Sequence, residues 1–61
     1  MPVITLEAGQ LSAAQKRELV VKLTQTAAGI MQANEQHFTV LIKENKPENI
    51  GFAGSWLGEK K

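Results

Sequence analysis

The sequence contains no cysteine, no tyrosine and only one histidine, His37. Disulfides are therefore excluded, and a zinc site of the usual Cys/His type has too few ligands. No apolar run approaches the ~20 residues of a membrane span, and no basic-then-apolar signal opens the chain. The formal net charge is only +1, so no broad basic face favours nucleic acid. We expect a cytoplasmic protein without a metal, membrane or nucleic-acid partner.

What the chain does have is apolar content: 43% of its residues are hydrophobic, too many for a disordered tail. Its 61 residues allow one domain, which we assign to residues 1–61. A domain of this size buries only about 60% of the surface that its unfolded chain exposes. Small domains usually compensate with disulfides, a metal or partner subunits. Because disulfides are excluded and a metal site is disfavoured, we expect the protein to self-associate.

The order of segments predicts an α/β fold, a single β-α-β unit with a short C-terminal hairpin. Residues 3–7 (VITLE) and 37–44 (HFTVLIKE) are β-branched and apolar, as strands are. Between them, apolar residues at helical spacing predict a helix over residues 13–33. Residues 50–57 (IGFAGSWL) combine apolar residues with glycines and predict a hairpin. The two strands should be parallel, with a right-handed crossover, and the helix can cover only one face of their sheet.

The helix carries its own start and stop signals. Ser12 is followed three residues later by Gln15, which is a capping-box pattern, and Asn34 is the expected end. The side chains predicted to form the core are Leu19, Leu23, Ala27 and Ile30. The uncovered sheet face, which includes Leu41, requires another copy of the chain to bury it.

Four segments in this order resemble the 4-oxalocrotonate tautomerase family: "MP" before a strand, "SAAQK" at the helix start, "FTVLIKE", and the tail "GFAGSWL". Each motif alone is weak, but together they span nearly the whole chain. The resemblance implies a β-α-β protomer that assembles as a homohexamer, with a trimer or dimer as alternatives. It also implies a catalytic N-terminal proline and no cofactor.

The proline would be Pro2, exposed as a secondary amine once Met1 is removed. A 1,3-proton shift in a small enol or 2-hydroxydienoate-type acid needs a base that takes a proton and returns it to another carbon. Such a base works best when its pKa lies near the working pH. An α-amino group titrates near 7.7–8.0 in model peptides, and burial lowers that value. The alternative interpretation is that Pro2 merely follows Met1.

The residues expected to bind the substrate depart from the family's pattern. The family's founding activity grips a dicarboxylate with two arginines, at positions that carry Leu11 and Thr39 here. Ile50 stands where the family has a pocket phenylalanine, with Phe52 two residues later. Lys43 or Lys46 is the candidate cation for one carboxylate, although a strand-end lysine is the plainer interpretation of Lys43. Because leucine and threonine cannot replace a bidentate guanidinium, we expect poor activity on the dicarboxylate 2-hydroxymuconate.

Two other functions stay open at the level of sequence. In the first, a protonated Pro2 assists hydration, dehalogenation or decarboxylation of a small acid, and the missing arginines argue against it. In the second, Met1 is retained, the Pro2 nitrogen is a tertiary amide, and the protein is a non-catalytic oligomeric relic. His37 has no partner histidine or cysteine, so its favoured interpretation is a solvated turn residue.

Overall fold

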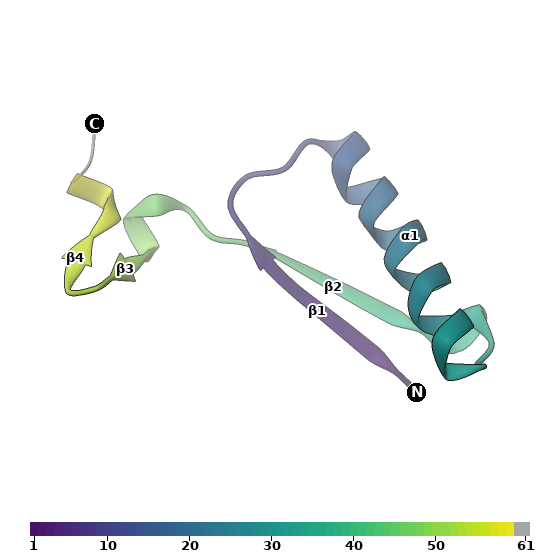
Figure 1. The fold of residues 1–61 in the computed structure, drawn as a ribbon. Coiled ribbons are helices and arrows are strands. Elements are labelled where there is room, and N and C mark those ends of the chain that lie inside the picture. The colour runs from purple at the N-terminus through teal and green to yellow at the C-terminus, as the bar shows by residue number, and fades with distance from the viewer. Residues whose placement is uncertain (60–61) are drawn as a thin grey trace.

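The computed structural model describes residues 1–59 and has the predicted β-α-β order (Figure 1). Strands β1 and β2 pair in parallel, and helix α1 connects them. Two further strands form an antiparallel hairpin near the C-terminus. The elements are β1 (Val3–Ala8), α1 (Ala13–Met31), β2 (Thr39–Glu44), β3 (Gly51–Phe52) and β4 (Ser55–Trp56), with short 3₁₀ helices at Glu35–His37, Pro47–Asn49 and Leu57–Glu59.

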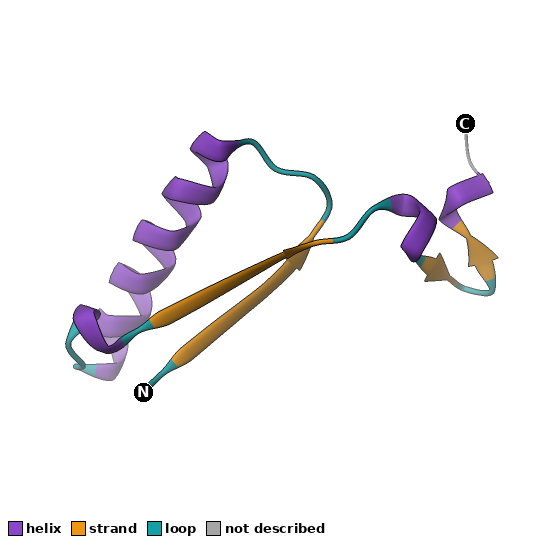
Figure 2. Ribbon diagram, turned by 180° about the vertical axis from the view of Figure 1, so that it is seen from behind, coloured by secondary structure: helices purple, strands orange, loops and turns teal. Residues whose placement is uncertain are grey.

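The sheet has one covered and one uncovered face. Helix α1 lies against a single side of β1 and β2 (Figures 1 and 2), and the side chains of Ile4 and Leu6 on that side are half-buried. Alternate residues point the other way, because successive side chains of a strand face opposite sides of a sheet. We call this second side the open face; its exposed residues are Val3, Thr5, Glu7, Leu41 and Lys43.

The start of α1 confirms the predicted capping box. The Gln15 backbone N–H donates to Ser12 Oγ at 3.1 Å, and the Ser12 N–H donates to Gln15 Oε1 at 2.9 Å. These bonds satisfy two of the backbone donors that a helix leaves free at its first turn.

The predicted end of the helix is wrong, because α1 stops at Met31. Gln32 adopts a left-handed conformation with φ 54°, and its N–H donates to the Ala28 carbonyl. The N–H of Ala33 donates to the same carbonyl at 3.0 Å, so the chain turns away before Asn34. Asn34 instead caps the 3₁₀ helix Glu35–His37.

The capping of that 3₁₀ helix also corrects the start of the second strand. Asn34 Oδ1 accepts from the Gln36 N–H at 2.9 Å, which places His37 in the short helix rather than in a strand. β2 therefore begins at Thr39, two residues later than predicted, while β1 continues to Ala8, one residue further than predicted.

The predicted core is right for three positions and wrong for one. Leu19, Leu23 and Ala27 are half-buried, but Ile30 is 78% exposed. Two strands about 5 Å apart are narrower than a helix with its side chains, about 10 Å wide, so they cannot cover the whole apolar stripe of α1. Among residues 1–59 only Ala28, on the last turns of α1, is buried, with 5% of its surface exposed.

The hairpin is confirmed within the predicted residues. Positive φ angles at Ala53 (52°) and Gly54 (80°) reverse the chain between β3 and β4, as in a two-residue primed turn. The Leu57 N–H donates to the Ile50 carbonyl at 2.9 Å and closes the hairpin. This hairpin extends away from the β-α-β unit (Figure 1).

The protomer is extended and leaves much apolar surface uncovered. Its radius of gyration is 14.9 Å, whereas a compact chain of this length has about 10 Å. Its accessible surface is 5029 Å², against about 3,900 Å² for a compact monomer of this mass. No helix within residues 1–59 has the length and apolarity to cross a membrane. The large exposed apolar side chains are Met1, Val3, Val20, Val21, Ile30, Met31, Leu41, Phe52 and Trp56.

Candidate active site

Pro2 is held at the point where β1 and β2 begin. Its carbonyl accepts a hydrogen bond from the Thr39 N–H at 3.0 Å, which continues the parallel ladder by one step beyond the Val3–Thr39 pair. Pro2 is half-buried, whereas Met1 before it is 88% exposed. The structure therefore places two predicted site residues, Pro2 and Thr39, side by side on a rigid element.

Met1 lies against Thr39 at the same end of the sheet. The Thr39 hydroxyl donates a weak hydrogen bond to Met1 Sδ over 3.6 Å. The methionine side chain thus occupies the space beside this hydroxyl, and its removal would open that space next to the Pro2 nitrogen.

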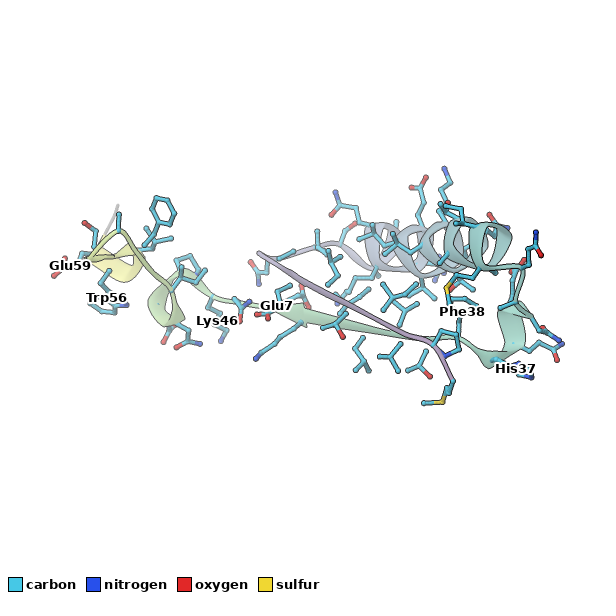
Figure 3. All side chains as sticks on the ribbon, turned by 60° about the horizontal axis from the view of Figure 1, so that its bottom comes forward. Glu7, His37, Phe38, Lys46, Trp56 and Glu59 are labelled. Carbon is cyan, nitrogen blue, oxygen red and sulfur yellow. The ribbon has the colours of Figure 1, made fainter. Side chains whose placement is uncertain are left out.

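A shallow hollow of about 450 Å³ surrounds this end of the sheet. We call it the Pro2 hollow. His37 and Phe38 lie at the end of the sheet remote from the C-terminal hairpin (Figure 3). The residues that line the Pro2 hollow are Met1, Pro2, Gln36, His37, Phe38 and Thr39.

His37 is the lining residue that the sequence did not indicate as functional. It ends the 3₁₀ helix Glu35–His37 and is exposed, as expected of a turn residue, yet it shares a hollow with Pro2. One feature of the sequence could have indicated this position, because His37 precedes Thr39 by two residues. In a parallel pair, residues that precede the two strands meet at one edge of the sheet.

The other predicted site residues of the β-α-β unit lie elsewhere in the protomer. Lys43 pairs with Glu7, four residues along from the Val3–Thr39 pair, which corresponds to about 13 Å of strand. Leu11 follows the far end of β1 and lines a different hollow of about 380 Å³, which is mostly apolar and runs along α1.

The hairpin carries the last two predicted residues away from Pro2. Ile50 is half-buried at the base of the hairpin, and Phe52 on β3 is 74% exposed. The neighbouring Trp56 donates its indole N–H to the Glu48 carbonyl at 2.6 Å, which anchors the hairpin to the 3₁₀ helix Pro47–Asn49. A site that combines Pro2 with Leu11, Ile50 or Phe52 therefore needs more than one copy of the chain.

Glu44, at the end of β2, fixes where Leu11 lies. Glu44 Oε2 accepts from the Leu11 backbone N–H at 2.8 Å, and Oε1 pairs with Lys16 Nζ at 3.0 Å. The hydrogen bond from Leu11 and, after it, that from Lys16 lower the pKa of the Glu44 carboxyl below its ordinary value. The carboxylate thus ties the start of α1 to the end of the sheet.

The charges around Pro2 are sparse. The residues that line the Pro2 hollow include no lysine and no arginine, and His37 is the lining side chain that can carry a positive charge. Within residues 1–59, no three histidine, aspartate or glutamate side chains gather as a metal site would require. The polar side chains that line this hollow are thus an imidazole, a hydroxyl and an amide, and the Pro2 nitrogen is in a peptide bond with Met1.

Comparisons with known proteins identify relatives along the full chain. A family model described as a tautomerase enzyme matches residues 2–60. A probable tautomerase from Halalkalibacterium halodurans is 31% identical over 61 residues, which cover 98% of this chain and all of that protein.

Solved structures share the fold. The crystal structure of a 4-oxalocrotonate tautomerase homologue superposes with a TM-score of 0.93 at 22% identity, over all of this chain and 98% of that one. A heterohexamer 4-oxalocrotonate tautomerase from Chloroflexus aurantiacus has a TM-score of 0.86 at 22% identity, with both chains fully covered.

Proposed function

Because this chain belongs to the tautomerase family, we propose that it is a tautomerase whose Pro2, once Met1 is removed, is the general base. Its reaction is a 1,3-proton shift in a small enol or 2-hydroxydienoate-type acid. The observation that carries the proposal is the position of Pro2: half-buried, bonded through its carbonyl to the Thr39 N–H, and open to the Pro2 hollow. A rigid strand and a partly apolar setting are what an amine base needs.

The proton shift needs no redox or metal partner. The Pro2 lone pair takes the proton of the enol O–H, and the electrons of that bond form the carbonyl. The carbon–carbon double bond then takes the proton back from the Pro2 nitrogen at the carbon that becomes saturated. One O–H bond breaks and one C–H bond forms, so the nitrogen ends as it began.

The active assembly in this proposal is a homohexamer, with a trimer or dimer as alternatives. Two features support it. The protomer exposes roughly 1,100 Å² more surface than a compact monomer of its mass would. In addition, Leu11, Ile50 and Phe52 lie away from Pro2 within one protomer, so a wall of these residues around Pro2 must come from neighbouring copies.

Intact mass spectrometry of natively expressed protein tests the first requirement. We expect a mass lower by one methionine residue, because Met1 is exposed and precedes a small residue. Retained Met1 in all of the native protein would overturn the proposal, since a tertiary amide has no basic lone pair.

Substitution of the base tests the second requirement. With phenylenolpyruvate as substrate, we expect Pro2→Ala to lower kcat/KM by about 100-fold, the lower end of what a general base contributes. Pro47→Ala, at an exposed proline in the 3₁₀ helix Pro47–Asn49, is the matched control and should keep the wild-type rate. Equal rates for wild type and Pro2→Ala would refute the role of Pro2.

A titration of the Pro2 nitrogen separates the tautomerase from the hydratase, dehalogenase and decarboxylase alternatives. A base must be largely unprotonated at the working pH, whereas those reactions use the protonated amine. We expect ¹⁵N NMR of the processed protein to show a nitrogen that loses its proton near neutral pH. A nitrogen still protonated well above neutrality would favour the alternatives.

A further inference from the structure

We propose that His37 binds the carboxylate of the substrate beside Pro2, and so selects enols that carry one carboxylate. The inference rests on the proposed function, because it concerns the same hollow. It begins from one juxtaposition: the chain's single histidine lines the Pro2 hollow.

The parallel register explains why His37 and the proline nitrogen come together. Val3 lies opposite Thr39, and the Pro2 carbonyl bonds to the Thr39 N–H. His37 and Met1 both line the Pro2 hollow, although His37 belongs to the 3₁₀ helix Glu35–His37 and not to β2. The bond that attaches Met1 to the Pro2 nitrogen therefore lies at the side of the molecule that carries this hollow.

Removal of Met1 frees space on that same side. The Met1 side chain rests on the Thr39 hydroxyl, with Sδ 3.6 Å from Oγ1, and it also lines the hollow. Once Met1 has left, a small acid can lie between His37, the Thr39 hydroxyl and the freed nitrogen. Its reacting carbon then faces the base while its carboxylate faces the imidazole.

Charge assigns the carboxylate to His37 rather than to a lysine. The hollow is lined by no lysine or arginine, and Lys43 lies about 13 Å further along the strand pair. Glu35 begins the same 3₁₀ helix but does not line the hollow, so no carboxylate lines it either. An imidazole donates an N–H to a carboxylate both as a cation and as the neutral ring.

One imidazole accounts for a preference for one carboxylate. A second carboxylate of the substrate would lose water without gaining a cation, which is costly. The Thr39 hydroxyl adds a neutral donor, suited to the carbonyl or enol oxygen that gains charge during the proton shift.

Kinetics with paired substrates test this binding role. For phenylenolpyruvate, His37→Ala should raise KM about tenfold, as expected for loss of a hydrogen bond to a charged group, with kcat changed by less than about twofold. For the methyl ester of the same enol, which has no carboxylate, KM should stay the same. His37→Arg should restore the KM for the acid, because a guanidinium also donates to a carboxylate.

A second positive charge of the chain, outside the hollow, provides the control for this test. Arg17→Gln removes an exposed positive charge on α1 outside the hollow and should leave both substrates unaffected. If His37→Ala raises KM equally for the acid and the ester, or for neither, the inference is wrong. The proposed function stands in that case so long as Pro2→Ala remains impaired.

A binding measurement keeps the inference testable without turnover. Because the chain has one histidine, its imidazole protons give one set of NMR signals. Phenylpyruvate should shift these signals in the processed wild type and in Pro2→Ala, and its methyl ester should not. If phenylpyruvate does not shift the imidazole signals, the inference is wrong. If the signals shift but the protein turns over no enol, the carboxylate site is supported and only the proposed reaction is refuted.

Discussion

At the scale of single residues, our expectation about substrate range rests on position 39, where the resemblance to the family implies an arginine and this chain has threonine. Thr39 stands beside Pro2, bonded to it through the backbone, and its hydroxyl reaches toward Met1. A threonine can donate one neutral hydrogen bond but cannot pair with a carboxylate as a guanidinium does. The residues that line the Pro2 hollow thus include one imidazole and no guanidinium.

We therefore expect kcat/KM for the dicarboxylate 2-hydroxymuconate to be at least about tenfold below that for phenylenolpyruvate, the cost of one missing charged hydrogen bond. Thr39→Arg should lower KM for the dicarboxylate, so that the two values of kcat/KM come closer together. Gln25→Arg, at an exposed residue of α1 that lines neither the Pro2 hollow nor the hollow of Leu11, adds the same charge elsewhere and should change neither value. A wild-type protein that prefers the dicarboxylate would contradict the argument.

At the scale of elements, α1 depends on side chains at its first turn. Ser12 and Gln15 exchange hydrogen bonds with each other's backbone N–H groups. We expect Ser12→Ala to lower the free energy of unfolding by about 1 kcal/mol, the usual cost of losing an N-cap. Urea unfolding at one fixed protein concentration would measure it, because association is coupled to stability. Gln25→Ala, in the exposed middle of α1, should stay within about 0.5 kcal/mol of wild type.

The same helix start should make the protein sensitive to acid. Hydrogen bonds from the Leu11 N–H and from Lys16 lower the pKa of Glu44 in the folded state. A lowered folded pKa means that this stabilisation is present above the ordinary glutamate pKa and is lost as the pH falls through the folded value. Glu44→Gln should therefore lower the unfolding midpoint at neutral pH and flatten its decline toward acid.

Melting curves measured across the acid range check the Glu44 prediction. Glu18→Gln is the matched control, because the exposed Glu18 pairs with Lys22 within α1 itself. Its curve should keep the wild-type slope. An unchanged acid slope in Glu44→Gln would show that the carboxylate does not couple the helix start to the sheet.

At the scale of the whole molecule, the open face is the part of the protomer that most needs a partner. Val3, at the start of β1, and Leu41, in the middle of β2, are each about half exposed, at 51% and 53%. We expect Leu41→Glu to produce a smaller species in native mass spectrometry and to reduce turnover, because a charge buried between copies is costly. Gln25→Glu should keep the wild-type mass. A full-size assembly of Leu41→Glu would place the interface elsewhere.

The sequence predicted those parts of the structure that depend on neighbours in the chain. The capping box at Ser12 and Gln15, the alternation along β1, and the hairpin between Gly51 and Trp56 were read from local spacing, and the structure confirms them. Local hydrogen bonds and side-chain periodicity are properties of a few consecutive residues, so one sequence suffices to recognise them. The family resemblance was recognisable for the same reason, since its motifs keep their order and spacing.

What only the tertiary structure decided concerns contacts between distant segments. The left-handed turn at Gln32 ended α1 early, and the narrow sheet left Ile30 exposed despite its helical spacing. His37 and Pro2, 35 residues apart in the sequence, line one hollow because the parallel pairing brings the starts of β1 and β2 to the same end of the sheet. Register depends on how α1 returns the chain to the sheet, and no local pattern specifies that return. Thus the sequence predicted the order of the elements and offered Pro2 as the candidate base, whereas the crossover decided which side chains lie beside Pro2.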